Sequence, residues 1–287
     1  MRHGFLLVDK PVGPTSHDIV YGVRKRLNER DIGHLGTLDP AASGLLVLAV
    51  GAKALKVIEL FSGLPKEYEA DITFGAISTT YDSAGVIDQI EQKPGWSVPD
   101  IPILNRTIED RFIGNIEQVP PAHSAIHVDG KRAYDLARAG NAISMKPRNV
   151  TIEQCDVVSY DYPHLKLNIR CSSGTYIRSL AHDLGHLLRC GAYLSGLRRM
   201  RVGEWSVEHA VPPEDTKWSD ILPLKDIMAG FPRMELNDEE MRDISHGKTM
   251  NRVSDRESIA WYDGYPVAIL IPVTKDGKTS MRPRKVF

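Results

Sequence analysis

Alternation between apolar and polar positions predicts several strands in the first two hundred residues. Residues 68–74 alternate in this way, and so do residues 165–171, where every second residue is apolar. Residues 45–50 instead form an unbroken apolar run, which is typical of a buried strand. Together with residues 4–9 and 192–202, these segments predict the strands of a sheet.

Helical spacing of apolar residues is clearest just after the first predicted strand. Thr15 and Ser16 offer an N-cap to a helix whose apolar residues recur at helical spacing, at Ile19, Val20, Val23 and Leu27. Further short helices are predicted at 52–61, 131–139 and 176–189. Because strands and helices follow without a regular βαβ rhythm, the pattern predicts an α+β fold rather than a doubly wound sheet.

Proline and glycine divide the chain into a large and a small predicted domain. Residues 1–211 are expected to form the large domain, with 118–149 as a projecting arm around several prolines and glycines. Residues 84–102, rich in Gly, Pro and Asp, are expected to be an exposed loop, and residues 212–229 a linker. Residues 230–287 are expected to form the small, β-rich domain. It is predicted to hold one helix and three strands, at 236–247, 258–262, 266–272 and 280–286.

The composition is that of a globular protein without a membrane-spanning segment. Of the 287 residues, 42% are hydrophobic and 25% are charged. The apolar run at 5–8 is too short for a signal peptide, and the run at 45–50 is far too short to cross a bilayer. The cysteines, Cys155, Cys171 and Cys190, lie too far apart for a C-x-x-C motif. We therefore expect reduced thiols, a cytoplasmic location and no membrane partner.

Charge is distributed unevenly although the formal net charge is only −1. Residues 170–201 carry six basic side chains against one acidic side chain, whereas residues 61–110 carry three basic against nine acidic. A basic face beside an acidic remainder is compatible with RNA binding, because binding depends on the local potential. The alternative is that this basic face is exposed to solvent and binds no RNA.

The strongest candidate for chemistry is a glycine-rich segment with one acidic residue, Asp39. Three glycines between 33 and 44 allow tight turns, and Pro40 favours a turn that keeps the Asp39 carboxylate out of strand pairing. The buried run 45–50 follows directly, and loops attached to a rigid strand often carry catalytic groups. An ordinary Asx turn that caps the strand is the alternative that these residues leave open.

Residues 33–44 resemble the catalytic motif of the TruB family of pseudouridine synthases, G-H-x-G-T-L-D-P-x-A-x-G followed by apolar residues. Leu35 stands where Thr or Ser is usual, and Ala42-Ser43 replaces the commoner Ala-Thr, but no side chain assigned to the chemistry is lost. Other segments resemble the family in the family's order, so chance is a poor explanation. They are Lys10-Pro11 and residues 66–68, 118–121, 124–125, 130–134, 137–140, 174–178 and 197–199.

The resemblance implies a pseudouridine-synthase fold: a mixed or antiparallel sheet with flanking helices, and a small β-rich C-terminal domain of the PUA type. It also implies an isomerase that converts one uridine in the TΨC arm of tRNA into pseudouridine without a cofactor or metal. The target base must be flipped out of the RNA, at a cost of roughly a few kcal/mol. Stacking on an aromatic side chain offsets about 1–3 kcal/mol of such a cost.

The resemblance assigns a role to seven side chains. Asp39 matches the catalytic nucleophile and Arg178 the cation paired with it, because a nearby cation offsets the cost of a charged carboxylate in a closed site. The other five match substrate-binding positions. They are Tyr68, which stacks on the uracil; Tyr176, a second pocket tyrosine; Leu197, an apolar wall; His34, which fills the space that the base leaves; and Lys10, which supports the loop or contacts a phosphate.

Three other functions remain open. A guide-dependent synthase that modifies rRNA would need partners, whereas the proline-bearing arm and the short C-terminal domain favour a bacterial-type enzyme without an obligatory protein partner. A non-catalytic RNA-binding or folding factor would not need Asp39, Tyr68 and Arg178 together. A metal hydrolase could use His182 and His186, spaced as in H-E-x-x-H, but Asp replaces the Glu and no third ligand is clear. No metal is therefore predicted.

Overall fold

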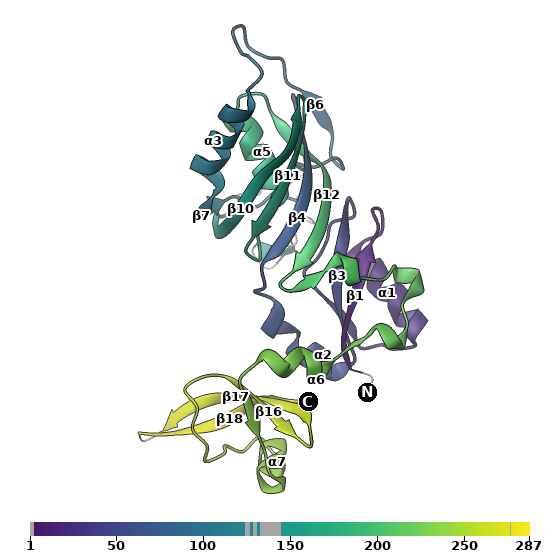
Figure 1. Cartoon of the computed structure of the whole chain (residues 1–287), viewed down its shortest axis with the longest axis vertical. Helices are drawn as coiled ribbons and strands as arrows, with labels where there is room; N and C mark the ends of the chain where they lie inside the picture. Colours follow the sequence, from purple (N-terminus) through teal and green to yellow (C-terminus); the bar gives the residue numbers. More distant parts are fainter. Residues whose placement is uncertain (1–2, 124–126, 129–130, 133–144, 276) are drawn as a thin grey trace.

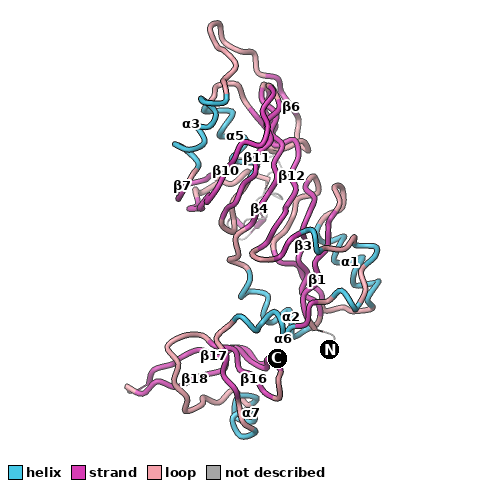
Figure 2. The backbone as a smooth tube through the Cα atoms, viewed as in Figure 1, coloured by secondary structure: helices cyan, strands magenta, loops and turns pink. Residues whose placement is uncertain are grey.

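The computed structural model describes residues 3–123, 127–128, 131–132, 145–275 and 277–287, which build an elongated molecule around two main sheets (Figure 1). Strands dominate both ends of the molecule, and helices cover parts of the larger sheet (Figure 2). The predicted α+β class is confirmed. Of the helices in these ranges, none is both long enough and apolar enough to cross a membrane.

The larger sheet is mixed and mainly antiparallel. Its strands are β1 (Gly4–Lys10), β2 (Ile32–Leu35), β3 (Ala42–Val50), β4 (Lys66–Phe74), β7 (Gly114–Gln118), β10 (Arg148–Asp161), β11 (His164–Cys171), β12 (Ala192–Val202), β13 (Trp205–Ser206) and β14 (Leu222–Pro223). The spatial order is β14-β1-β3-β12-β4-β11-β10-β7, with β2 paired to β3 and β13 paired to β12. β3 and β12 run parallel, with Leu197 opposite Ala42. This pairing brings the start of β3 beside the middle of β12.

β3 is buried on both faces, which explains its unbroken apolar run. Leu46 and Leu48 pack in a cluster with helix α1 (Ser16–Leu27), while Leu45 and Val47 pack with helix α2 (Ala52–Val57) on the other face. Helix α1 begins at its predicted cap. The Thr15 hydroxyl accepts a hydrogen bond from the Asp18 amide, and the Asp18 carboxylate accepts one from the Thr15 amide.

Two helices cover the other half of the larger sheet, over β4, β10 and β11 (Figure 1). They are α3 (Ile101–Phe112) and α5 (Ile177–Leu187). The α3 helix was not predicted, although Asp100 caps it and Leu104, Ile108 and Phe112 recur every fourth residue on its buried face. The neighbouring glycines and prolines hid this pattern.

The predicted loop at 84–102 is only partly correct. It contains a short strand, β6 (Ile87–Gln89), which pairs with β5 (Ala76–Ser78), and it ends where α3 begins. The start of the predicted helix at 131–139 is also wrong, because Lys131–Arg132 is strand β9, paired with β8 (His127–Val128). Residues 133–144, with the rest of that predicted helix and much of the predicted arm, lie outside the described residues.

The small C-terminal sheet has the predicted β-rich character. It holds β15 (Arg233–Glu235), β16 (Ser258–Tyr262), β17 (Tyr265–Lys275) and β18 (Lys278–Val286), and helix α7 (Asp238–Ser245) packs on it. The three predicted strands and the predicted helix are confirmed. Strand β15 is an addition to the prediction.

Residues 212–229, predicted to be a linker, are bound to both sheets. β14 pairs with β1, and the next helix, α6 (Leu224–Ile227), buries Leu224 in an apolar cluster that also holds Phe61 and Trp261. Arg284 and Lys285 of the small sheet form ion pairs of 2.5 and 2.8 Å with Glu59 of the large domain. The small sheet is therefore docked on the large domain by apolar packing as well as by charge.

Gly44 allows β3 and β12 to approach each other closely. It has a φ of +100°, and a Cβ atom there would lie 2.3 Å from the carbonyl oxygen of Arg199 and 2.7 Å from its amide nitrogen. We expect Gly44→Ala to lower the free energy of unfolding by about 2–6 kcal/mol, from backbone strain plus overpacking. Gly114→Ala is the matched control, since Gly114 has a φ of +91° but open space around it. Urea denaturation of both variants tests this, and equal losses would contradict it.

Candidate active site

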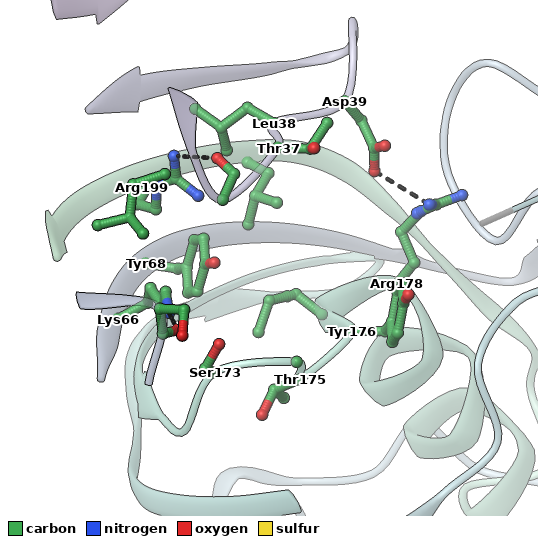
Figure 3. Close-up of a pocket in the computed structure, with 16 residues that line it drawn as sticks. Thr37, Leu38, Asp39, Lys66, Tyr68, Ser173, Thr175, Tyr176, Arg178 and Arg199 are labelled. Atoms are coloured by element: carbon green, nitrogen blue, oxygen red, sulfur yellow. Dashed lines mark hydrogen bonds and ion pairs between the residues drawn. The ribbon is translucent and has the colours of Figure 1, made fainter. Parts of the chain in front are cut away.

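A cavity of about 390 Å³ opens between the residues that follow β2, the strands β4 and β12, and the start of α5 (Figure 3). Five of the seven side chains predicted for the site line it: Asp39, Tyr68, Tyr176, Arg178 and Leu197. Cavities of this size accommodate small ligands or a single base. Segments far apart in the sequence therefore meet at one place.

Asp39 and Arg178 form an ion pair at one side of the cavity. An oxygen of the Asp39 carboxylate lies 3.0 Å from Nη2 of Arg178, and the Asp39 side chain is 44% exposed whereas that of Arg178 is 8% exposed. The two side chains point toward each other, the carboxylate from the loop and the guanidinium from α5 (Figure 3). The pair thus presents a carboxylate to a ligand and holds a buried cation against it.

Further contacts hold Arg178 from the other side. Its Nη1 lies 3.5 Å from the carboxylate of Asp82 and donates to the carbonyl of Thr80 at 3.3 Å, and its Nη2 donates to the carbonyl of His123 at 3.1 Å. The Asp82 side chain is itself only 8% exposed and accepts hydrogen bonds from the Thr80 hydroxyl and the Ala84 amide. The guanidinium therefore bridges one exposed and one buried carboxylate. Sequence reasoning missed Asp82, although it lies in a hydroxyl-rich turn typical of a hydrogen-bonded carboxylate.

Polar contacts from helix α1 and strand β1 hold the Asp39 loop, residues 36–41, and the residue that follows it. The Ser16 hydroxyl exchanges hydrogen bonds of 2.9 Å with both the amide and the carbonyl of Leu38. Lys10 donates to the carbonyl of Ala42 at 2.7 Å, just after the loop, and is completely buried. Of the two roles predicted for Lys10, these contacts fit support of the loop. A phosphate contact does not fit the buried ammonium, and Lys10 lies outside the cavity lining.

Arg199 joins the start of the Asp39 loop to strand β3. Its Nη2 donates to the carbonyl of Gly36 at 3.0 Å and its Nε donates to the carbonyl of Leu45 at 2.7 Å, and the side chain is 1% exposed. Arg199 also lines the cavity opposite the Asp39–Arg178 pair (Figure 3). Sequence analysis included this arginine in a family-like segment but assigned it no role. Its two hydrogen bonds therefore connect the first residue of the loop to the strand that follows the loop.

Gln118 positions the start of α5. Its side-chain amide accepts a hydrogen bond from the amide of Tyr176 at 2.8 Å and donates one to the Tyr176 carbonyl at 3.0 Å. The hydroxyl of Ser179 donates to the carbonyl of Val119 at 2.7 Å. The end of β7 and the residue after it are thus fastened to the first turn of the helix that carries Arg178.

Burial shapes the protonation of two groups on β4. It raises the pKa of the Tyr68 phenol, an effect that the positive charge of Arg199 opposes. Burial lowers the pKa of Lys66 to about 8, with Arg199 contributing in the same direction, and the ammonium donates to the carbonyl of Leu64 at 2.6 Å. At neutral pH Tyr68 therefore presents a neutral ring to the cavity.

His34 lies on β2, directly before the cavity-lining residues, and does not line the cavity itself. Its ring packs edge-to-face on that of His17, with centroids 5.3 Å apart. Burial lowers its pKa. The buried Nε2 of His34 has no hydrogen-bond partner in the part of the chain that the structure describes.

The two histidines of the H-x-x-x-H spacing have no third metal-binding side chain beside them among the residues that the structure describes. Across the described ranges, no cluster of three or more His, Cys, Asp or Glu side chains could hold a metal ion. The ring of His182 instead stacks on that of Tyr81, with centroids 3.9 Å apart. The three cysteines are buried free thiols.

Comparison with known proteins identifies the relatives of this chain. Residues 24–177 match the family model described as TruB family pseudouridylate synthase (N-terminal domain), and residues 178–218 match the tRNA pseudouridylate synthase B C-terminal domain. The chain is 39% identical to the tRNA pseudouridine synthase B of Ralstonia nicotianae, over 86% of this chain and 81% of that protein. It is 36% identical to that of Syntrophomonas wolfei, over 99% of this chain and 98% of that protein.

Among solved structures, the fold resembles that in a crystal structure of a Cbf5–Nop10–Gar1 complex. The TM-score is 0.72 at 23% identity, over 99% of this chain and 84% of that one. The likeness at this identity concerns the fold, which agrees with the predicted mixed sheet and flanking helices. By its matches to the family models and to its relatives, the chain belongs to the TruB family of pseudouridine synthases.

Proposed function

We propose that this protein isomerises one uridine in the TΨC arm of tRNA to pseudouridine, with Asp39 as the nucleophile. The observation that carries the proposal is the half-exposed Asp39 carboxylate, held 3.0 Å from Arg178 at the mouth of a cavity that also presents Tyr68. The names of its relatives, tRNA pseudouridine synthase B, support tRNA as the substrate.

The reaction conserves the atoms of the nucleotide. The bond between N1 of uracil and C1′ of ribose breaks, the base turns, and a bond forms between C5 and C1′. The hydrogen on C5 leaves as a proton, and N1 gains one. Asp39 assists by attacking the sugar or the base, or by helping the base to depart, and Arg178 holds the carboxylate in place in each case.

The remaining predicted residues fit around a flipped base in this proposal. Tyr68 offers a neutral aromatic face for stacking, Tyr176 forms a second wall, and Leu197 supplies apolar contact. His34 lies beside the cavity, where it would fill the space that the base leaves. Lys10 acts behind the loop, through Ala42, rather than on the RNA.

We propose that the segments of the chain have the roles that the sequence predicts for them. Residues 1–211 carry the chemistry, and the arm at 118–149 grips the RNA next to Arg178, which His123 at the base of the arm contacts. Residues 230–287 form a PUA-like domain that is docked on the catalytic part by its apolar cluster. We propose that the protein acts on tRNA without an obligatory protein partner.

Tritium release tests the function directly. tRNA transcribed with uridine labelled at C5 loses tritium to water when the C5–C1′ bond forms. We expect release from full-length tRNA and from an isolated T-arm hairpin, and none when the target uridine is replaced by cytidine. No release from free tRNA despite tight binding would overturn the proposal. If guide RNA and partner proteins then restored the release, the guide-dependent function would be favoured. If they did not, a non-catalytic RNA-binding factor would be favoured.

A further inference from the structure

Arg178 depends on a short turn, residues 79–85, for half of its contacts. This turn supplies the carbonyl of Thr80 and the carboxylate of Asp82, which hold Nη1 of Arg178. Because Nη2 faces Asp39, a shift of the turn would swing the guanidinium and change the distance between Arg178 and Asp39. Tyr81 lies between these two contacts in the sequence.

Tyr81 has an unusual backbone conformation. Its φ is +64°, in the left-handed region that bulky residues rarely adopt. Its carbonyl accepts a hydrogen bond from the amide of Leu194 on β12 at 3.0 Å, and its amide donates to the carbonyl of Ser78 at 3.1 Å. Such a conformation persists when the surroundings fix it, and it is frequent at active sites.

The side chain of Tyr81 is fixed by a ring stack on α5. Its ring lies nearly parallel to that of His182, at an interplanar angle of 9° and a centroid distance of 3.9 Å. His182 follows Arg178 by four residues, so both side chains project from the same face of the helix, one turn apart. One helix thus carries the guanidinium and also fixes the turn that holds it.

His182 is suited to packing rather than to polar contact. Its buried Nδ1 has no hydrogen-bond partner in the described part of the chain. Burial and the neighbouring His186 lower its pKa, so that a neutral ring faces Tyr81 at neutral pH. The residue that the sequence pattern marked as a candidate metal ligand therefore has another use.

We propose that Tyr81 and His182 are positioning residues for catalysis. Their ring stack holds the turn at 79–85 so that Thr80 and Asp82 present Arg178 to Asp39 in a single orientation. The proposal rests on the proposed function, in which the Asp39–Arg178 pair carries the chemistry. It predicts that loss of the stack slows the chemical step and leaves RNA binding unchanged.

Two substitutions at Tyr81 separate the ring from the backbone conformation. Tyr81→Gly adopts a positive φ freely but has no ring, whereas Tyr81→Phe keeps the ring and the backbone constraint. We expect the single-turnover rate of tritium release to fall about 10- to 100-fold in Tyr81→Gly, the order expected for a small misplacement of a catalytic group. Tyr81→Phe should keep the wild-type rate, and the Kd for tRNA should change by less than about twofold in both. His182→Phe, which keeps a flat ring, should likewise outperform His182→Ala.

A double-mutant cycle with Asp82 tests whether the stack acts through the turn. In the Asp82→Asn background, Tyr81→Gly should cause little further loss of rate, because the contact that it positions is already weakened. The proposal would be overturned if the loss of rate in the double variant equalled the product of the losses in the two single variants. A wild-type rate in Tyr81→Gly would also overturn it.

A measurement that needs no turnover distinguishes a failure of the positioning role from a failure of the proposed function. The ¹⁵N NMR signal of the Arg178 side chain, assigned by its disappearance in Arg178→Lys, should shift in Tyr81→Gly and not in Tyr81→Phe. Absence of tritium release by the wild-type protein would refute the proposed function and leave this test intact. An unshifted Arg178 signal in a folded Tyr81→Gly variant would refute the positioning role.

Discussion

Replacing Asp39 by asparagine is expected to abolish pseudouridine formation while tRNA binding persists. Asparagine matches the shape of aspartate and can still accept a hydrogen bond from Arg178, but it has no charge and is a very poor nucleophile. We expect the single-turnover rate of tritium release to fall by about 10⁴-fold or more, the order seen when an enzyme loses its nucleophile. Because the side chain is 44% exposed, we expect the unfolding temperature to stay close to that of the wild type.

The control for this experiment is Asp88→Asn, on the exposed strand β6 and outside the cavity. It should release tritium at the wild-type rate. The Kd for tRNA should be similar for the wild type and both variants, since Asp39 repels phosphate rather than binding it. Retained turnover in Asp39→Asn would refute the assignment of the nucleophile. Loss of turnover together with loss of binding would assign Asp39 to substrate binding instead.

Replacing Arg178 by lysine is expected to lower the rate about 10²- to 10³-fold, as for loss of one preorganised charged donor. The guanidinium contacts Asp39, Asp82 and two backbone carbonyls at the same time. An ammonium is a compact point charge and cannot span these acceptors, so the substitution keeps the charge and loses the geometry. Single-turnover tritium release at saturating enzyme measures this loss apart from binding. Arg252→Lys, whose ion pair with Glu240 lies in the small domain, is the control and should keep the wild-type rate.

Truncation of Arg178 separates its structural role from its catalytic one. Arg178→Ala leaves the buried Asp82 carboxylate without its cation, so we expect the free energy of unfolding to fall by about 3–5 kcal/mol. Combining Arg178→Met with Asp82→Asn removes the unpaired charge and should restore much of that stability. Activity should remain absent in the double variant. Recovery of activity along with stability would show that the arginine supports the fold alone.

Prediction from the sequence succeeded where local patterns reflect burial. The alternation at 165–171 and the apolar run at 45–50 both become strands of the larger sheet, and the Thr15 cap starts α1 as expected. Helix α3 shows the opposite case. Its apolar spacing is regular, but the Gly- and Pro-rich residues before it suggested a loop, and only burial against β10 and α5 makes the helix evident. The pairing of two residues of the predicted linker with the edge of the sheet likewise has no local signal in the sequence.

For the candidate site, the sequence, through its resemblance to the TruB family, determined which chemical groups to expect: the Asp39 carboxylate, the arginine beside it, and an aromatic wall from Tyr68 and Tyr176. The motifs identify these groups because each chemical role requires a particular type of side chain. Only the tertiary structure decided how those groups are held. Asp82 and Arg199 were missed because each acts through a contact more than 90 residues away in the sequence. For Lys10 the sequence left two roles open, and only its burial and its hydrogen bond to Ala42 favour support of the loop over a phosphate contact. Burial and long-range pairing arise only when the sheet is assembled, so no local pattern of residues records them.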